Sequence, residues 1–307
     1  MGGIAEPSLR FLHYAVLLGL FGWTAFRLIG LRGLKWVPQT RGGAVLIMAA
    51  IAAPLLSLAL MQVSIAAMMG LPIKTLDWAM TEAMILGTDM GWVFLLRAAL
   101  LIIGLCALLA RHRTTAALPI AAACFAGALM TLGWSGHAAA TEGALGMFHR
   151  LNNGVHLLSA GLWLGAIGWF LHLTVAAHRA PDHGSAPPLL AKMHGFAPLG
   201  VGLVATVALT GLINSQLIFG LENGAMVLTT TYGLLLAAKV ILVGGMLAFG
   251  AHNAGIARRQ ALAGDSASAS SRATLSTLRQ SLVGEIALAV IVTALVAVLG
   301  TLSPTMM

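Results

Sequence analysis

The sequence predicts an all-α polytopic membrane protein with eight transmembrane helices. Of its 307 residues, 59% are hydrophobic and only 8% are charged, whereas a soluble domain carries about 25% charged residues. The apolar runs have the length of about 20 residues that a helix needs to cross a bilayer core. They do not alternate as the strands of a membrane barrel do. We therefore expect one helical transmembrane domain over residues 1–307, embedded in a lipid bilayer.

Eight segments are long and apolar enough to span the membrane. They are roughly residues 11–31, 43–70, 91–110, 115–135, 150–175, 193–219, 231–251 and 282–302.

The basic residues predict the orientation of these spans. Eleven lie in the four connections that would share one side, namely Arg32, Lys35, Arg41, Arg111, Arg113, Arg179, Lys192, Arg258, Arg259, Arg272 and Arg279. The opposite side has three, Arg10, Lys74 and Arg150. Because cytoplasmic loops of membrane proteins collect Lys and Arg, the first side is predicted to be cytoplasmic and both termini periplasmic. This bias also explains the net charge of +8 without a nucleic-acid partner.

The last cytoplasmic connection, about 254–278, contains the run GDSASASSR and is predicted to be a flexible loop. No Walker loop, dinucleotide fingerprint, nucleophile elbow or HExxH motif occurs. We therefore do not expect an enzyme.

Two halves of the chain share unusual features at an offset of about 143 residues. His13 is followed nine residues later by Gly22, as His156 is by Gly165. TDMG at 88–91 precedes Arg97 as TTYG at 230–233 precedes Lys239. These matches predict two parallel four-helix repeats, about 10–140 and 149–304. Transporters often build their sites between such repeats.

Three ionisable side chains fall inside the predicted spans, namely Arg97, Lys239 and Glu285. Charges are costly there and often mark a substrate path. They are candidates for lining such a path. The alternative is a structural role, with the basic residues extending to the interface or forming an internal charge pair.

Four histidines lie near the predicted outer boundary of the membrane. His149 and His156 are two helical turns apart on one face, His13 opens the first span and His137 closes the fourth. Imidazole is the commonest metal-ligand side chain. These four residues are therefore candidate metal ligands.

Methionines are frequent on the same side and add soft donors. Met80 and Met84 are one helical turn apart in the loop after the second span, and Met61 and Met68 share a face of that span. Thioethers with imidazoles select copper, with Cu(I) favoured and Cu(II) a second candidate. Met is also a common packing residue, which is the alternative for each of them.

Several stretches together resemble the copper resistance protein D (CopD) family of bacterial inner-membrane proteins. The resemblance covers nearly the whole chain and is strongest in the fifth, seventh and eighth spans. The stretches are RFLH at 10–13, TDMGWVFLLR at 88–97, GHA at 136–138, HRLNNGVHLLSAGLWLGAIGWF at 149–170, LTGLINSQLIF at 209–219, TTYGLLLAAKVILVGGMLAFGAHN at 230–253 and LRQSLVGEIALAVIVTALVAVLGTLSP at 278–304.

The resemblance implies a protein of copper homeostasis that moves copper across the inner membrane, with a separate periplasmic CopC-like carrier as its partner. Two positions depart from the family pattern. Asn153 replaces an acidic residue often found three positions before the span-five histidine, and Ala254 replaces an arginine after Asn253. A site at His156 would therefore carry less negative charge than in family members that have the acidic residue.

From these observations we expect a copper transporter whose outer site contains His13, His137, His149 and His156, with Met80 and Met84 at its entrance. The first alternative is a redox protein in which His13 and His156 hold a b-type haem. The second is a structural or sensor protein whose histidines respond to pH. Direction of transport and oligomeric state are left open.

Overall fold

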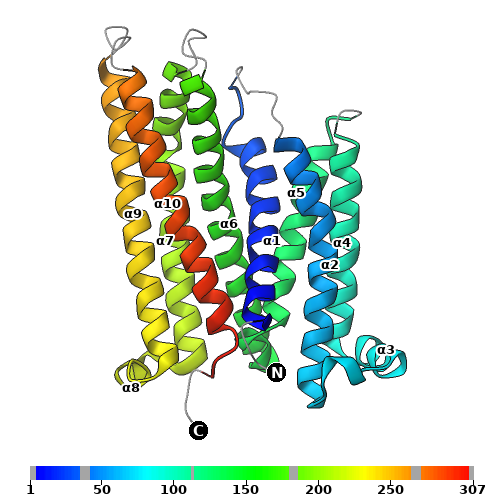
Figure 1. Ribbon diagram of the computed structural model, residues 1–307. Coiled ribbons are helices and arrows are strands. Elements are labelled where there is room, and N and C mark those ends of the chain that lie inside the picture. Colours follow the sequence, from blue (N-terminus) through cyan, green and yellow to red (C-terminus); the bar gives the residue numbers. More distant parts are fainter. Residues whose placement is uncertain (1–4, 35–41, 112–113, 180–185, 264–270, 304–307) are drawn as a thin grey trace.

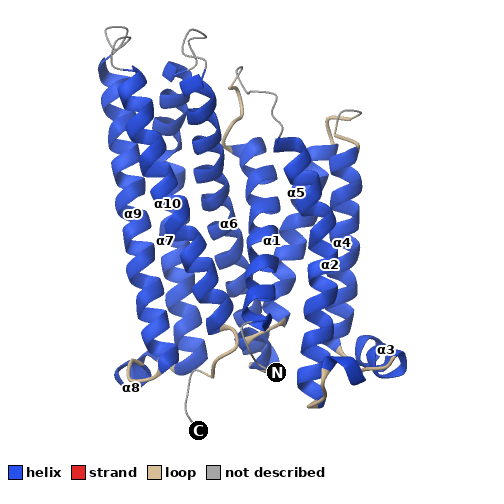
Figure 2. Ribbon diagram, in the orientation of Figure 1, coloured by secondary structure: helices blue, strands red, loops and turns tan. Residues whose placement is uncertain are grey.

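A computed structural model describes residues 5–34, 42–111, 114–179, 186–263 and 271–303, and Figure 2 shows these residues as helices joined by short loops. Eight helices are long and apolar enough to cross a membrane, which confirms the predicted number of spans. They are α1 (Ala5–Ile29), α2 (Gly42–Met69), α4 (Asp89–Leu109), α5 (Ala117–Met130, continued by a 3-10 turn at Thr131–Trp134), α6 (Gly143–Arg179), α7 (Ala186–Phe219), α9 (Thr231–Ala263) and α10 (Ser271–Leu299).

Several helices extend beyond the apolar runs that marked them. The predicted loop at 254–278 is wrong in its bounds, because α9 continues to Ala263 and α10 begins at Ser271. Gln260 of α9 donates a hydrogen bond to Thr274 of α10 at 3.1 Å. Hydropathy marks only the part of a helix that crosses the hydrocarbon, and polar turns continue the helix into the aqueous side. Only residues 264–270 of this connection lie outside the described part of the chain.

The long helices form two groups of four that lie side by side (Figure 1). One group contains α1, α2, α4 and α5, and the other contains α6, α7, α9 and α10. Each group contains most of one apolar core, and Phe26 and Leu31 of the first group also belong to the core of the second. Leu17, Leu101 and Phe125 are fully buried in the first, and Leu173 and Leu278 in the second.

The two groups meet where α1 packs against α6, and glycines allow this close approach. A Cβ on Gly22 would lie 2.2 Å from the carbonyl oxygen of Gly161, and a Cβ on Gly165 would lie 2.1 Å from the carbonyl oxygen of Gly22. The contact therefore requires Gly22 and Gly165, because any side chain there would push the backbones apart. These are the two glycines that the repeat alignment matched.

Helix α1 begins and α10 ends at the same end of the bundle, which we call the terminal end (Figure 1). Two short helices lie there, α3 (Trp78–Gly87) before α4 and α8 (Gly224–Val227) before α9. The opposite end, where α1, α4, α6 and α9 finish, is the loop end. This arrangement agrees with connections that alternate between two sides of a membrane.

Much of the helical surface is apolar and exposed. Ile241 is 73% exposed and Val201 is 70% exposed, both on long helices of the second group. A soluble protein rarely exposes contiguous apolar surface of this kind. A lipid bilayer covers it instead.

Candidate functional site

A cavity of about 270 Å³ opens at the terminal end among α1, α2, α4 and the segment that follows α5. Its wall combines apolar, soft and charged side chains. The polar and sulfur-bearing members are Glu6, Arg10, His13, Tyr14, Ser57, Met61, Ser64, Met68, Met90, Arg97, Trp134 and Ser135.

Three methionines give this cavity its soft character. Met61 and Met68 come from α2 and Met90 from the first turn of α4. Ser57, Met61, Ser64 and Met68 follow one another at intervals of four, three and four residues, so they line one face of α2. Met61 is 4% exposed and Met68 54% exposed, so the thioethers extend from the interior to the surface.

His13 is the imidazole of this cavity. It is 1% exposed, and its Nε2 is 2.7 Å from the Oγ of Ser57 on α2. The other ring nitrogen, Nδ1, is buried and has no hydrogen-bond partner among the described residues. A buried imidazole nitrogen without a partner is uncommon, and a neutral ring can use it to bind a metal ion.

Arg97 brings a buried positive charge to the same cavity. Its Nε donates to Thr131 Oγ1 at 2.6 Å and its Nη2 to Thr131 O at 3.0 Å. The side chain is 8% exposed, so it points into the bundle instead of extending to the interface. Arg97 joins α4 to the end of α5 and acts electrostatically on His13.

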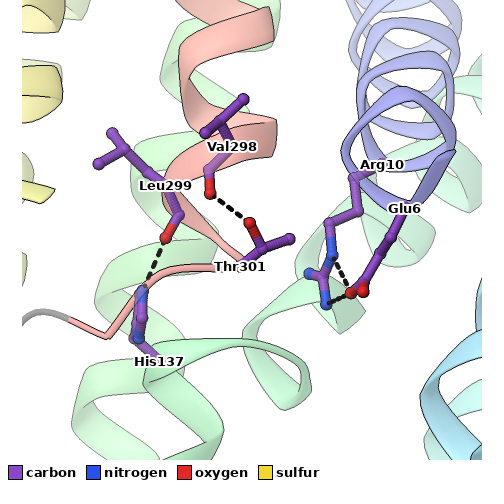
Figure 3. Close-up of polar contacts among 6 residues, drawn as sticks. All are labelled: Glu6, Arg10, His137, Val298, Leu299 and Thr301. Atoms are coloured by element: carbon purple, nitrogen blue, oxygen red, sulfur yellow. Dashed lines mark hydrogen bonds and ion pairs between the residues drawn. The ribbon is translucent and has the colours of Figure 1, made fainter. Parts of the chain in front are cut away.

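The first two turns of α1 carry an ion pair that lines the same cavity. Glu6 Oε1 accepts from Arg10 Nε at 3.1 Å and from Arg10 Nη2 at 3.0 Å (Figure 3). Both residues line the cavity. One acidic and one basic group therefore share the cavity wall with His13.

His137 and His149 are near the terminal end but face other partners. His137 Nε2 donates to the carbonyl oxygen of Leu299 at 3.2 Å, which ties the segment after α5 to the last turn of α10 (Figure 3). His149 is 1% exposed, and its Nδ1 is 2.9 Å from Thr141 Oγ1. Neither residue lines the cavity around His13.

His156 occupies a polar cluster in the second group of helices. Its Nδ1 is 2.9 Å from Thr210 Oγ1 on α7, and Lys239 of α9 acts on it electrostatically. Asn152, one turn earlier on α6, donates to Thr210 O at 2.9 Å and to Asn214 Oδ1 at 2.8 Å. Each group of helices thus has a histidine bonded to a hydroxyl on a neighbouring helix, with a basic residue nearby.

Glu285 lies deep in α10 and is not paired with Lys239. Asn253 of α9 donates its Nδ2 to Glu285 Oε2 at 3.1 Å. Glu285 is midway along α10 and does not line the cavity at His13.

Of the two methionines predicted at the entrance, Met84 lies against the cavity wall and Met80 does not. Met84 packs on the buried cluster of Met61, Ile65 and Phe94. Met80, in the first turn of α3, donates its backbone N–H to the cap residue Asp77 at 2.7 Å. The thioethers that do line the cavity are those of α2 and α4, and the spacing of Met61 and Met68 was the sequence signal for them.

The four candidate histidines are not gathered into one site. Within the described ranges, no three His, Cys, Asp or Glu side chains lie close enough together to hold a metal ion. His13 and His156 each bond to a different neighbouring helix, and α1 and α6 between them pack backbone against backbone at Gly22 and Gly165. This packing gives no support to a haem held between the two histidines.

The fold and the cavity define a class: a multi-span helical membrane protein with thioethers and an imidazole in a cavity at one end. Comparison with known proteins narrows this class. Residues 1–147 match the family model described as copper resistance protein D-like, N-terminal domain, and residues 190–299 match that of copper resistance protein D. The chain is 32% identical over 310 residues to copper resistance protein D of Pseudomonas syringae pv. tomato, covering 97% of this chain and 96% of that protein.

The chain therefore belongs to the copper resistance protein D family, as the sequence motifs indicated. The two family models leave residues 148–189 unmatched, and most of α6 falls in this gap. No solved structure matches the chain at a significant level.

Proposed function

We propose that the protein carries copper across the bacterial inner membrane as part of copper resistance, and that copper enters through the cavity at His13. The observation that carries this proposal is the coincidence of a free imidazole nitrogen, His13 Nδ1, with three thioethers in one cavity. Soft sulfur and imidazole donors favour Cu(I) over the hard cations that are far more abundant. The copper of this proposal is the cargo and does not stay with the protein.

The terminal end is the periplasmic side in this proposal. Eleven basic residues in the connections of the opposite side, against three at the terminal end, support that orientation. A periplasmic CopC-like carrier would then deliver copper to the cavity, and the Glu6–Arg10 pair at its beginning is a polar feature that such a carrier would meet.

The contact between α1 and α6 is the proposed meeting point of two structural repeats. The two matched glycines face each other there, and each group places a histidine, a hydroxyl partner and a basic residue on corresponding helices. Parallel repeats of this kind allow one half to move against the other. The halves are not chemically equal, because the methionine-lined cavity lies in the first.

The site is tested by Cu(I) binding to the purified protein, measured in competition with a chromophoric Cu(I) chelator. His13→Ala and the double variant Met61→Leu/Met90→Leu should each weaken binding about 10-fold or more, which corresponds to about 1.4 kcal/mol or more. Met246→Leu is the matched control, because Met246 is 3% exposed but lies in the core of the second group.

Unchanged affinity in both cavity variants would overturn the site. The same titration of His137→Ala, His149→Ala and His156→Ala tests the other ligands expected from the sequence. Transport itself is tested by copper uptake into proteoliposomes containing the wild-type protein.

A further inference from the structure

Glu285 is a buried acidic group that the copper cavity does not use. It is 2% exposed in the apolar helix α10, and its Oε1 lies close to α9, 3.6 Å from where a Cβ on Gly250 would stand. A carboxylate inside a membrane protein is costly unless it is paired, and such residues commonly take part in proton relays.

Within the described ranges, no basic side chain forms an ion pair with this carboxyl group. The helices packed on α10 are α9, α6 and α1. From α9, Asn253 donates its amide N–H at 3.1 Å, and from α6, Trp163 lies near the carboxyl group. The basic group of α1 on this half, Arg27, lies over the ring of Trp169 at 5.5 Å. Among the described residues the one acid–base ion pair is Glu6–Arg10 at the other end.

Polar atoms connect Glu285 to a groove between α9 and α10. Ser281 is one helical turn before Glu285, and its Oγ is buried without a hydrogen-bond partner in the described part of the chain. The Oδ1 of Asn253 is likewise buried without a hydrogen-bond partner among the described residues. Ser281 also lines a groove together with His252, Thr277 and Gln280, which lie in the loop-end halves of α9 and α10. Glu285 does not itself line this groove, but Ser281, one helical turn away, does.

The charges of the two halves suggest what the carboxyl group does. Arg97 already places one positive charge in the copper cavity, and a bound cuprous ion adds a second. Accumulating charge in a low-dielectric bundle is unfavourable. If Glu285 releases its proton to the groove when Cu⁺ enters, the net charge inside the bundle does not change.

We propose that Glu285 is the proton-carrying residue of this transporter. For each cuprous ion that crosses, it releases one proton to the loop-end side through the groove at Ser281 and takes up one proton from the terminal-end side. The carboxylic acid dissociates to carboxylate and a proton that leaves to water at the loop end. The carboxylate takes up a proton from the terminal-end side when copper has left, so one proton crosses with each cuprous ion. No electron is transferred. This assignment rests on the proposed copper transport and adds the ion to which transport is coupled.

The test uses proteoliposomes with radioactive copper kept as Cu(I) by a weak chelator. With equal copper on both sides, an imposed pH gradient should drive copper accumulation by the wild-type protein. Glu285→Gln should lose this accumulation but retain exchange of external for internal copper, because that exchange needs no proton. Thr293→Val is the matched control. Thr293 is on the same helix and donates its hydroxyl to Ala289 O, so the variant should leave both activities unchanged.

The outcomes separate the two proposals. If the wild-type protein carries no copper at all, the proposed function is overturned. If it carries copper but ignores the pH gradient, or if Glu285→Gln also loses exchange, the coupling role of Glu285 is overturned.

Infrared spectroscopy gives a readout that does not depend on transport. The wild-type protein should show the C=O band of a protonated carboxylic acid, sensitive to deuterium exchange and lost in Glu285→Gln. Ser281→Ala should retain the band but slow its deuterium exchange. This variant replaces Glu285→Gln in the test if Glu285→Gln does not fold. Absence of the band in the wild type overturns the proposal.

Discussion

Gly22 of α1 and Gly165 of α6 touch so closely that a Cβ on Gly165 would lie 2.1 Å from the carbonyl oxygen of Gly22. The contact joins the two groups of helices, 143 residues apart in the sequence. Close approach through small residues is a main source of helix association in membranes, where lipid offers no hydrophobic driving force between helices.

Gly165→Ala should therefore destabilise the protein. Overpacking of a tight contact costs typically about 1–3 kcal/mol, and here the added methyl group meets backbone, which cannot rotate away. Thermal unfolding in detergent measures the loss. Gly19→Ala is the control on α1, because a Cβ there meets no atom within 4 Å. Equal melting temperatures for both variants would contradict the close contact.

Arg97 should affect stability through its hydrogen bonds and copper binding through its positive charge. Thr131→Val removes one acceptor of the buried guanidinium and should cost about 1–3 kcal/mol of stability, while leaving the positive charge in place. Arg97→Gln removes the charge and should raise Cu(I) affinity about 3- to 20-fold, because the repulsion between Arg97 and the ion disappears.

Chelator competition and thermal unfolding on both variants check this prediction. It fails if Thr131→Val changes Cu(I) affinity as much as Arg97→Gln does, since the effect would then come from the packing of α4 on α5.

His137 should behave as a structural tie at the end of α10. His137→Ala removes the hydrogen bond to Leu299 O and should cost about 1 kcal/mol, with faster hydrogen–deuterium exchange in the last turn of α10. Cu(I) affinity at the His13 cavity should not change. Tyr232→Phe is the control, because it retains the ring that packs on His137 at 5.7 Å. A large loss of Cu(I) affinity in His137→Ala would instead favour its expected role as a ligand.

Met80 and Met84 remain predicted entrance residues, and a double variant tests them. Met80→Leu/Met84→Leu preserves side-chain volume, so stability should change by less than about 1.5 kcal/mol. Loss of the two thioethers should slow initial copper uptake at low copper concentration. Met226→Leu on α8 is the control at the corresponding position of the second group. An unchanged rate of uptake would mean that these two methionines have only a packing role.

Length and composition were sufficient to predict eight spans, because a bilayer offers backbone groups no hydrogen-bond partner and so requires long apolar helices. The ends of the helices were less well predicted. α6 begins at Gly143 instead of residue 150, and α9 continues ten residues into the expected loop at 254–278. Apolar content records where lipid is, whereas hydrogen bonding decides where a helix ends.

The candidate site was only partly predictable. The sequence marked His13 and the shared face of Met61 and Met68, since both depend on local spacing. It also grouped His13 with His137, His149 and His156, which the structure places on separate partners: Ser57, Leu299, Thr141 and Thr210. Their expected common depth followed from their positions in the sequence, whereas the direction in which each side chain points from its helix did not.

The sequence by itself thus determined the number of spans, the family and the presence of soft donors near one side of the membrane, because these follow from composition and local order along the chain. Only the tertiary structure decided which donors meet. It set His13 beside Met61, Met68 and Met90, and Glu285 against Asn253. Such contacts depend on how whole helices pack, and in this protein the glycine contact between α1 and α6 brings the two groups together.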